Sequence, residues 1–240
     1  GFKKTECEFE APKLESKILK TYHETRNFPT TKTSEMSVHL RFGTISIRKL
    51  AHEAAQLNET YLKELIWREF FMQILYHFPK VVHESFKRKY DQILWLYDEE
   101  NLKKWQEGKT GYPIVDAGMR ELNETGFMHN RVRMVCASFF TKHLLMDWRI
   151  AEAYFPENLM DYDLSANNGN WQWSAGTGCD SAPYFRVFNP EEQQKKFDPA
   201  FKYIKKWIKE FGTKEYPKPI VEHKFARLRA LETYKKGLQE

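Results

Sequence analysis

Hydrophobic residues recur three and four positions apart in nearly every long segment of the 240-residue chain, which is the spacing of one face of an α-helix. The clearest case is the segment 60–78, whose apolar positions follow one another every four residues until Pro79 ends the pattern. Clean alternation of apolar and polar positions, which marks a half-buried strand, is absent. The pattern therefore predicts an all-α protein, and it contains no internal repeat.

Turn and cap residues predict where several helices begin and end. Ser46 can cap a helix over 47–57, because its hydroxyl can accept from a backbone N–H of the first turn. Pro113 suits the first position of a helix that Gly126 ends. Further helices are predicted over 14–28, 102–107, 130–146, 149–155, 199–211 and 223–238.

The segment 164–190 is the exception, because it has no regular period. It contains Trp171 and Trp173 and few charges, which is a poor composition for disorder. A long loop inside a compact domain is usually functional when it is ordered. We therefore expect an ordered, partly buried loop that lines a site.

Composition narrows the class of protein further. Hydrophobic residues make up 41% and charged residues 30% of the chain, which excludes a disordered or fibrous protein. No apolar run approaches the roughly 18 residues of a membrane span, and the first residues lack the apolar stretch of a signal peptide. Three cysteines are too few for a disulfide framework, which favours a reducing cytoplasm. The net charge of +5 permits a polyanionic partner without requiring one.

Glu64 and Trp67 are the first candidate site residues. They stand three positions apart on the helix predicted over 60–78, so they project from adjoining surface. A carboxylate beside an indole can hydrogen-bond a ligand on which the ring stacks. The alternative is a solvated glutamate next to a tryptophan of the core.

Two further segments offer groups that bind anions. Residues 33–37 place three hydroxyls at a predicted helix start, which suits a phosphate but also fits an ordinary N-cap. Arg131 and Arg133 begin another helix and can pair with carboxylate or phosphate. Asp161 and Asp163 have no further metal ligand at a suitable spacing, so we expect no metal site. The P-loop, GxGxxG, GxSxG and CxxC motifs are absent.

Six sequence blocks then occur in a fixed order along the chain. They are TSEMSVHLRFG (33–43), ELIWREF (64–70), TGYPIVDAGMR (110–120, with Trp105 before it), TGFMHNRVRM (125–134), NNGNWQW (167–173) and PYFRVFNP (183–190). Together they resemble the C-terminal, FAD-binding catalytic domain of the DNA photolyase/cryptochrome family, most closely the bacterial class I photolyases. The resemblance covers roughly residues 11–238.

The resemblance implies a helical domain that binds FAD noncovalently, in a folded conformation, at the base of a cavity open to DNA. Arg133 and Asp161 match an ion pair beside the flavin ring, Asp163 a second acid that contacts the flavin, and Asn167 the residue that faces its N5 atom. Tyr61 matches another FAD contact that is usually tryptophan. The residues that match the phosphate cradle are Tyr22, Thr33, Ser34, Met36 and Ser37.

The resemblance also implies sites for DNA and for electron transfer. The lesion pocket is matched by Glu64, Trp67, Asn130, Met134 and Trp173, and DNA-contacting positions by Arg26, Arg131 and Gln193. An electron-transfer triad that reduces the flavin is matched, from flavin to surface, by Trp171, Trp148 and Trp95. Spacing alone offers core packing as the alternative for each of these three tryptophans.

The implied function is light-dependent repair of cyclobutane pyrimidine dimers by a monomeric cytoplasmic enzyme that acts on damaged DNA. The alternatives are a signalling cryptochrome, for which Asn167 is the less usual residue, and a (6-4) photolyase, for which His129 supplies at most one of two expected histidines. We expect one helical catalytic domain over 1–240. We also expect this chain to lack the α/β domain that precedes it in photolyases and holds the antenna chromophore.

Overall fold

Residues 12–239, which a computed structural model describes, form α-helices joined by short 3-10 and π-helical turns. Within that range the backbone contains no strand, only one isolated bridge between Leu96 and Met146. The predicted all-α class is confirmed. In the same range no helix combines the length and the apolar composition that crossing a membrane requires.

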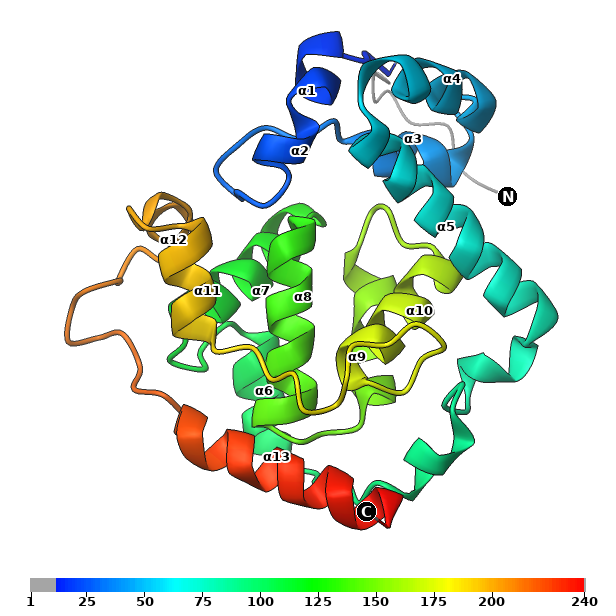
Figure 1. Ribbon diagram of the computed structural model, residues 1–240. Helices are drawn as coiled ribbons and strands as arrows, with labels where there is room; N and C mark the ends of the chain where they lie inside the picture. Colours follow the sequence, from blue (N-terminus) through cyan, green and yellow to red (C-terminus); the bar gives the residue numbers. More distant parts are fainter. Residues whose placement is uncertain (1–11, 240) are drawn as a thin grey trace, which may run out of the picture.

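The helices form two groups that α5 connects along one edge (Figure 1). The first group consists of α1 (Ser16–Lys20), α2 (Tyr22–Thr25), α3 (Met36–Phe42), α4 (Ile47–Leu57) and the first half of α5 (Glu59–His77). Its small core is built on Leu19, Met36, Leu50 and Leu65. The 3-10 turns η1 (Pro79–Val82) and η2 (Arg88–Gln92) then lead the chain to the second group.

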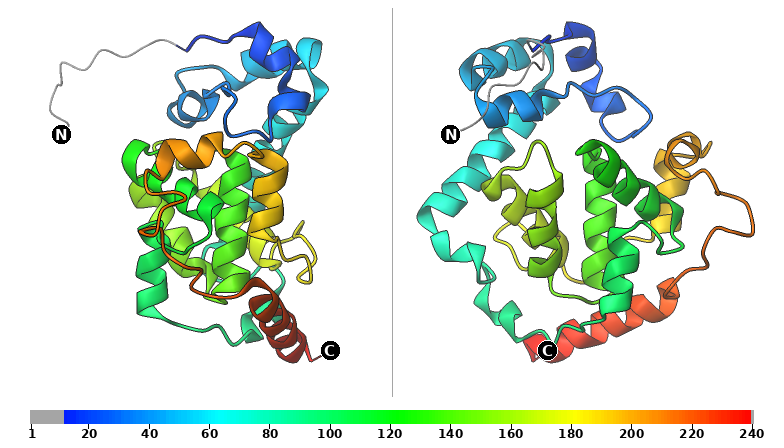
Figure 2. Two further views of the ribbon diagram at one scale, coloured as in Figure 1. Left: turned by 90° about the vertical axis from the view of Figure 1, so that its left-hand side faces the viewer. Right: turned by 180° about the vertical axis from the view of Figure 1, so that it is seen from behind.

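The second group holds the main core (Figure 2). It comprises α6 (Glu99–Gln106), α7 (Pro113–Thr125), α8 (Asn130–Ser138), α9 (Trp148–Asn158), α10 (Leu164–Ala175), α11 (Pro190–Phe197) and α12 (Lys202–Trp207), with α13 (His223–Leu238) along its far side. Fully buried side chains of this core include Trp105, Phe139, Phe140 and Trp148.

Several predicted helix boundaries are confirmed by their cap geometry. The Ser46 hydroxyl accepts from the Lys49 N–H, Pro113 occupies the first turn of α7, and Gly126 ends that helix with φ 71°. The helix α5 begins at Glu59, one residue earlier than predicted, because the Asn58 side chain caps it through a 3.1 Å bond from the Tyr61 N–H.

The prediction of a patternless loop over 164–190 is wrong for its first half, which is α10. The Asp163 carboxylate caps this helix by accepting from the Ala166 N–H at 3.1 Å, and Gly176 ends it with φ 89°. Asparagine, glycine and tryptophan are weak helix formers, so the residues of α10 gave no local signal. Tertiary packing determines the helical conformation of this segment instead. The contact with α5 is so close that a Cβ at Gly169 would clash with the ring of Phe71. The irregular stretch is confined to 176–189, between α10 and α11.

Other predicted helices have different bounds. The stretch 14–28 divides into α1 and α2, and α12 covers only the centre of the stretch predicted over 199–211. Asp98 caps α6 and so moves its start to Glu99. The helix predicted over 130–146 ends as α8 at Ser138 and continues as one π-helical turn, η3 (Phe139–His143).

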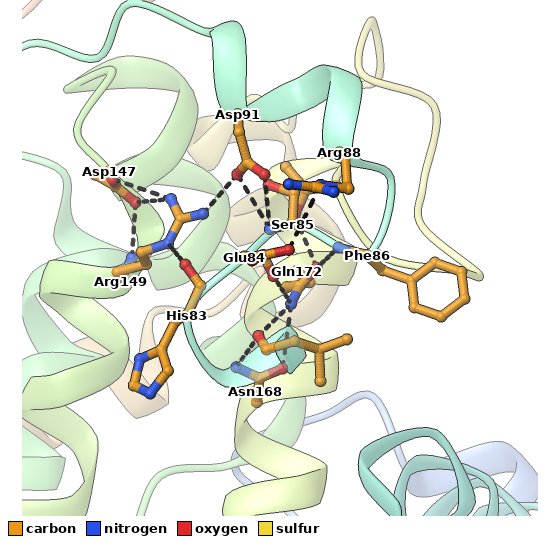
Figure 3. A network of polar contacts seen from close by, with 12 residues as sticks. His83, Glu84, Ser85, Phe86, Arg88, Asp91, Asp147, Arg149, Asn168 and Gln172 are labelled. Carbon is orange, nitrogen blue, oxygen red and sulfur yellow. Dashed lines mark hydrogen bonds and ion pairs between the residues drawn. The ribbon is translucent and has the colours of Figure 1, made fainter. Parts of the chain in front are cut away.

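Buried amide side chains attach α10 to the chain that follows α5 (Figure 3). Gln172 donates to the carbonyl of Val81 at 2.9 Å and accepts from the Phe86 N–H at 2.9 Å, and Asn168 donates to the same Val81 carbonyl. These bonds leave buried polar atoms satisfied, so they fix the position of α10 against η1. Residues 167, 171 and 173 on that helix are thereby held in place.

Candidate flavin and nucleic-acid site

The principal cavity among the described residues has a volume of about 780 Å³ and lies between the two helix groups. One wall comes from α2, the segment 29–35, α3 and α5, and the other from α8 and the chain around 161–173. A smaller cavity of about 100 Å³ shares eight lining residues with it, so the two cavities adjoin. This volume lies within the range of sites that bind drug-sized ligands and cofactors.

The first wall contains the predicted phosphate cradle. Thr33, Ser34 and Ser37 line the cavity where α3 begins, together with Tyr22 and Met36. The cap position of α3 is Glu35 in a left-handed conformation, φ 54°, and no side chain caps the helix. The ordinary N-cap reading is therefore wrong, because none of the three hydroxyls caps α3.

Two tyrosines stand behind this cradle. The Tyr22 and Tyr61 rings meet edge to face at 5.0 Å, and the Tyr61 hydroxyl shares a 3.0 Å hydrogen bond with Ser34. Burial raises the pKa of both phenols, so both are neutral hydrogen-bonding groups near neutral pH. Tyr61 therefore lies on the cavity wall and offers a hydroxyl group to it. The tryptophan that is usual at this position in the family would offer its ring N–H instead.

The second wall carries the predicted ion pair. One guanidinium nitrogen of Arg133 donates to both carboxylate oxygens of Asp161, at 3.1 and 2.9 Å, and the Arg133 Nε donates to the Met128 carbonyl. The Asp161 side chain is only 5% exposed, so this charge is held by its partner rather than by water. Burial alone would raise the pKa of Asp163, but hydrogen bonds from Ser165 and Ala166 bring it below its ordinary value.

Asn167 lies in the smaller cavity, on the first turns of α10. Its amide nitrogen donates to a carboxylate oxygen of Glu152 at 2.9 Å, which fixes the orientation of the side chain. Burial raises the pKa of Glu152. The sequence gave no reason to select Glu152, since it lies fifteen positions from Asn167 in an ordinary helix.

The five predicted lesion-pocket residues all line the principal cavity. Trp67 is 42% exposed and meets the rings of Phe70 and Phe71 only along one side, so the alternative of a core tryptophan is wrong. Glu64 is not freely solvated either, because it forms a 2.6 Å ion pair with Arg26 across the mouth of the cavity. The remaining three are Asn130, Met134 and Trp173.

Four predicted residues lie outside both cavities, namely Arg131, Gln193, Trp148 and Trp95. Arg131 is held in place, since it donates twice to the Asn27 side-chain oxygen and stacks over the Phe197 ring at 4.6 Å. Gln193 lies on α11, where its side-chain oxygen is buried without a hydrogen-bond partner.

The three predicted redox tryptophans differ in burial. Trp171 lines the smaller cavity at 2% exposure, Trp148 is fully buried, and Trp95 is partly exposed at the edge of the same core. Of the three, only Trp95 reaches the surface. Within residues 12–239, no three histidine, cysteine, aspartate or glutamate side chains gather as metal ligands.

Comparison with known proteins places this geometry in a family. Residues 61–213 match the family described as the FAD binding domain of DNA photolyase. The chain belongs to this family. Deoxyribodipyrimidine photo-lyase of Escherichia coli is 44% identical over 243 residues, and the match covers 89% of this chain and 52% of that protein. Deoxyribodipyrimidine photo-lyase of Neurospora crassa is 42% identical over 260 residues, and the match covers 90% of this chain and 42% of that protein. The chain thus spans about half the length of the curated relatives that it matches.

Solved structures agree in fold. A bacterial class III photolyase from Agrobacterium tumefaciens superimposes with a TM-score of 0.88 at 40% identity, covering 93% of this chain and 53% of that one. A Synechocystis cryptochrome superimposes with a TM-score of 0.82 at 31% identity, covering 90% and 52%. The expected membership of the photolyase/cryptochrome family is confirmed. The narrower expectation of class I is not confirmed, because the superimposed structure is of a class III enzyme.

Proposed function

We propose that this domain binds FAD in the two adjoining cavities and repairs cyclobutane pyrimidine dimers in DNA when illuminated. The observation that carries the proposal is that the matched cofactor residues and the matched lesion residues face one cavity from two walls. When bound, reduced FAD excited by blue light would supply one electron to the dimer and take it back after the ring opens. The protein has to hold the cofactor and the bases in place.

The cradle and the second wall perform the first task. The hydroxyls of Thr33 and Ser37 would donate hydrogen bonds to phosphate oxygens, because neither caps α3. Ser34 would do the same while its oxygen accepts from the Tyr61 hydroxyl. On the opposite wall, the Arg133–Asp161 pair presents a fixed charge distribution to a polar ring edge. Asn167, oriented by Glu152, adds one amide group of defined direction.

The cavity mouth performs the second task. Trp67 and Trp173 offer apolar faces on which extruded bases stack, and Glu64 accepts hydrogen bonds from their edges. Arg26, Arg131 and Gln193 contact the DNA around the opening. A dimer is already poorly stacked and poorly paired, so extruding it from the duplex costs less than extruding normal bases.

Within the family we propose the class I type acting on cyclobutane dimers, as a monomer in the cytoplasm. The runner-up is a cryptochrome that signals through a protein partner, and the similarity to the Synechocystis protein is its basis. The complete set of lesion-pocket residues and Asn167 favour repair over signalling. The proposed redox tryptophans are compatible with both.

The test begins with cofactor loading. Wild-type protein that has been incubated with FAD and separated from unbound FAD should release FAD on denaturation. The Ser34→Ala, Ser37→Ala double variant should release several-fold less FAD. Thr213→Ala, which alters an exposed hydroxyl outside the cavity, is the matched control. Absence of flavin from the wild-type domain would contradict the assignment of the cavity.

Repair is measured next on a short DNA duplex that contains one thymine dimer. Chemically reduced, FAD-loaded protein should restore the normal bases under blue light and not in the dark. A (6-4) lesion in the same duplex should remain unrepaired. A loaded protein that binds the dimer no better than undamaged DNA, and repairs neither lesion, would favour the cryptochrome alternative.

A further inference from the structure

Trp171 has one oxidisable ring neighbour that no sequence pattern identified. The rings within contact of Trp171 belong to Phe155 at 5.0 Å, Phe140 at 6.2 Å and Trp105 at 6.3 Å. Phenylalanine is much harder to oxidise than tryptophan, so among the described rings in contact with Trp171 only Trp105 can pass an electron to it. Trp105 comes from α6, whereas the predicted partner of Trp171, Trp148, comes from α9.

The environment of Trp105 decides what happens to a positive charge placed on it. Its ring is fully buried, and none of the described residues accepts a hydrogen bond from its indole N–H. An oxidised Trp105 therefore has no group to which it can lose a proton. The charge has to return to Trp171 or move to another ring.

Tyr154 on α9 provides that other ring. It meets Trp105 edge to face at 5.9 Å, and its hydroxyl donates to the Asn123 side-chain oxygen at 2.8 Å. Asn123 is exposed and lines a shallow surface hollow of about 410 Å³. The phenol therefore lies where an oxidised tyrosine can release its proton towards water.

We propose a second electron route, from Tyr154 through Trp105 to Trp171, which branches from the predicted triad at its first member. Trp171 gives one electron to the photoexcited oxidised flavin, Trp105 gives one to Trp171, and Tyr154 gives one to Trp105. Tyr154 then loses its phenolic proton to water past Asn123, which leaves a neutral tyrosyl radical. A soluble thiol restores Tyr154 by donating a hydrogen atom. The route rests on the proposed FAD site.

The first experiment compares photoreduction of bound oxidised FAD in the wild type and four variants under weak blue light with thiol. Trp148→Phe should keep a measurable rate, and adding Tyr154→Phe or Trp105→Phe should lower that residual rate at least about tenfold. Electron paramagnetic resonance should detect a tyrosyl radical in Trp148→Phe that Tyr154→Phe removes. Tyr76→Phe, which changes an exposed tyrosine without a tryptophan neighbour, is the matched control and should leave both signals unchanged.

Tyr154→Phe removes one hydroxyl of a half-buried residue, whereas Trp105→Phe alters the core. A lower rate in the Tyr154→Phe variant is therefore not explained by a loss of folding. A residual rate and radical signal that persist in the Trp148→Phe, Tyr154→Phe double variant would overturn the route. The FAD site is judged separately, since failure of the proposed function would abolish photoreduction in every protein, the wild type included.

A second experiment needs no flavin. A ruthenium photo-oxidant is attached to Glu124→Cys, beside the hollow that Asn123 lines, in a Cys7→Ser, Cys179→Ser background. Trp207 lines the same hollow, so Trp207→Phe is added to remove that oxidisable ring. Flash-quench oxidation should produce the transient absorption of a buried tryptophan radical, and Trp105→Phe should remove most of it. A signal that Trp148→Phe removes and Trp105→Phe leaves intact would place the route elsewhere.

Discussion

Replacing Trp67 by alanine should weaken the binding of dimer-containing DNA selectively. A base stacked on an aromatic side chain contributes about 1–3 kcal/mol by alanine substitution, which corresponds to an affinity loss of about 5- to 140-fold. The loss of folding free energy should be smaller than the about 3–5 kcal/mol typical of a buried tryptophan, because Trp67 is 42% exposed and its packing is limited to Phe70 and Phe71. Flavin content should be close to that of the wild type.

The assay is fluorescence anisotropy with a labelled duplex, with and without one dimer, at a single salt concentration. Tyr76→Ala is the matched control, because it removes an exposed aromatic ring from the same helix outside the cavity. The Trp67→Ala protein should lose most of its preference for damaged DNA, whereas the control should keep it. Equal losses on both duplexes, or a protein that no longer retains flavin, would refute the stacking role.

Four other outcomes test the remaining parts of the site. Arg131→Ala should lower the magnitude of the slope of log affinity against log salt by about 0.9 per lost phosphate contact, and an unchanged slope in binding titrations would place the DNA elsewhere. Trp171→Phe should block photoreduction of oxidised FAD yet leave repair by chemically reduced protein, and unchanged photoreduction would remove Trp171 from both electron routes. Gly169→Ala should destabilise the fold by about 1–3 kcal/mol in urea titrations because its methyl group meets the Phe71 ring, and a wild-type midpoint would contradict the tight contact between α5 and α10. The folded pKa of Asp163 lies below its ordinary value, so its contribution to stability is present above the ordinary aspartate range and is lost as the pH falls through the folded pKa. Asp163→Asn should therefore reduce the loss of folding free energy measured between about pH 5 and pH 2. An unchanged loss would exclude this carboxylate as a cause of the acid sensitivity.

Local signals in the sequence predicted much of the helical framework. Ser46, Pro113 and Gly126 stand where predicted, because a cap depends on a few adjacent residues. The helix α10 escaped prediction for the opposite reason. Its residues favour no regular structure locally, and contacts with α5 and with the carbonyl of Val81, about ninety positions earlier, decide its conformation.

In the candidate site, too, some residues were predictable from local sequence and others were not. The adjoining placement of Glu64 and Trp67 followed from helical spacing alone, whereas the pairing of Arg133 with Asp161 came from the family resemblance. Neither source identified Glu152 behind Asn167 or Asn27 behind Arg131. Such supporting residues lie far away along the chain and have ordinary compositions, so only the folded arrangement reveals them. The roles of the matched site residues remain predictions for the experiments above.

The helix α5 has a consequence for how reproducibly the cofactor and the lesion are spaced. Tyr61 on the cradle wall and Trp67 at the mouth are six residues apart on one rigid rod, which separates them by about 9 Å along its axis. One turn beyond Trp67, Phe71 packs on Gly169 of α10, the helix that carries Asn167 and Trp171. Electron transfer slows steeply with distance, so in the proposed reaction a separation set by one helix would keep the transfer rate the same from one encounter to the next.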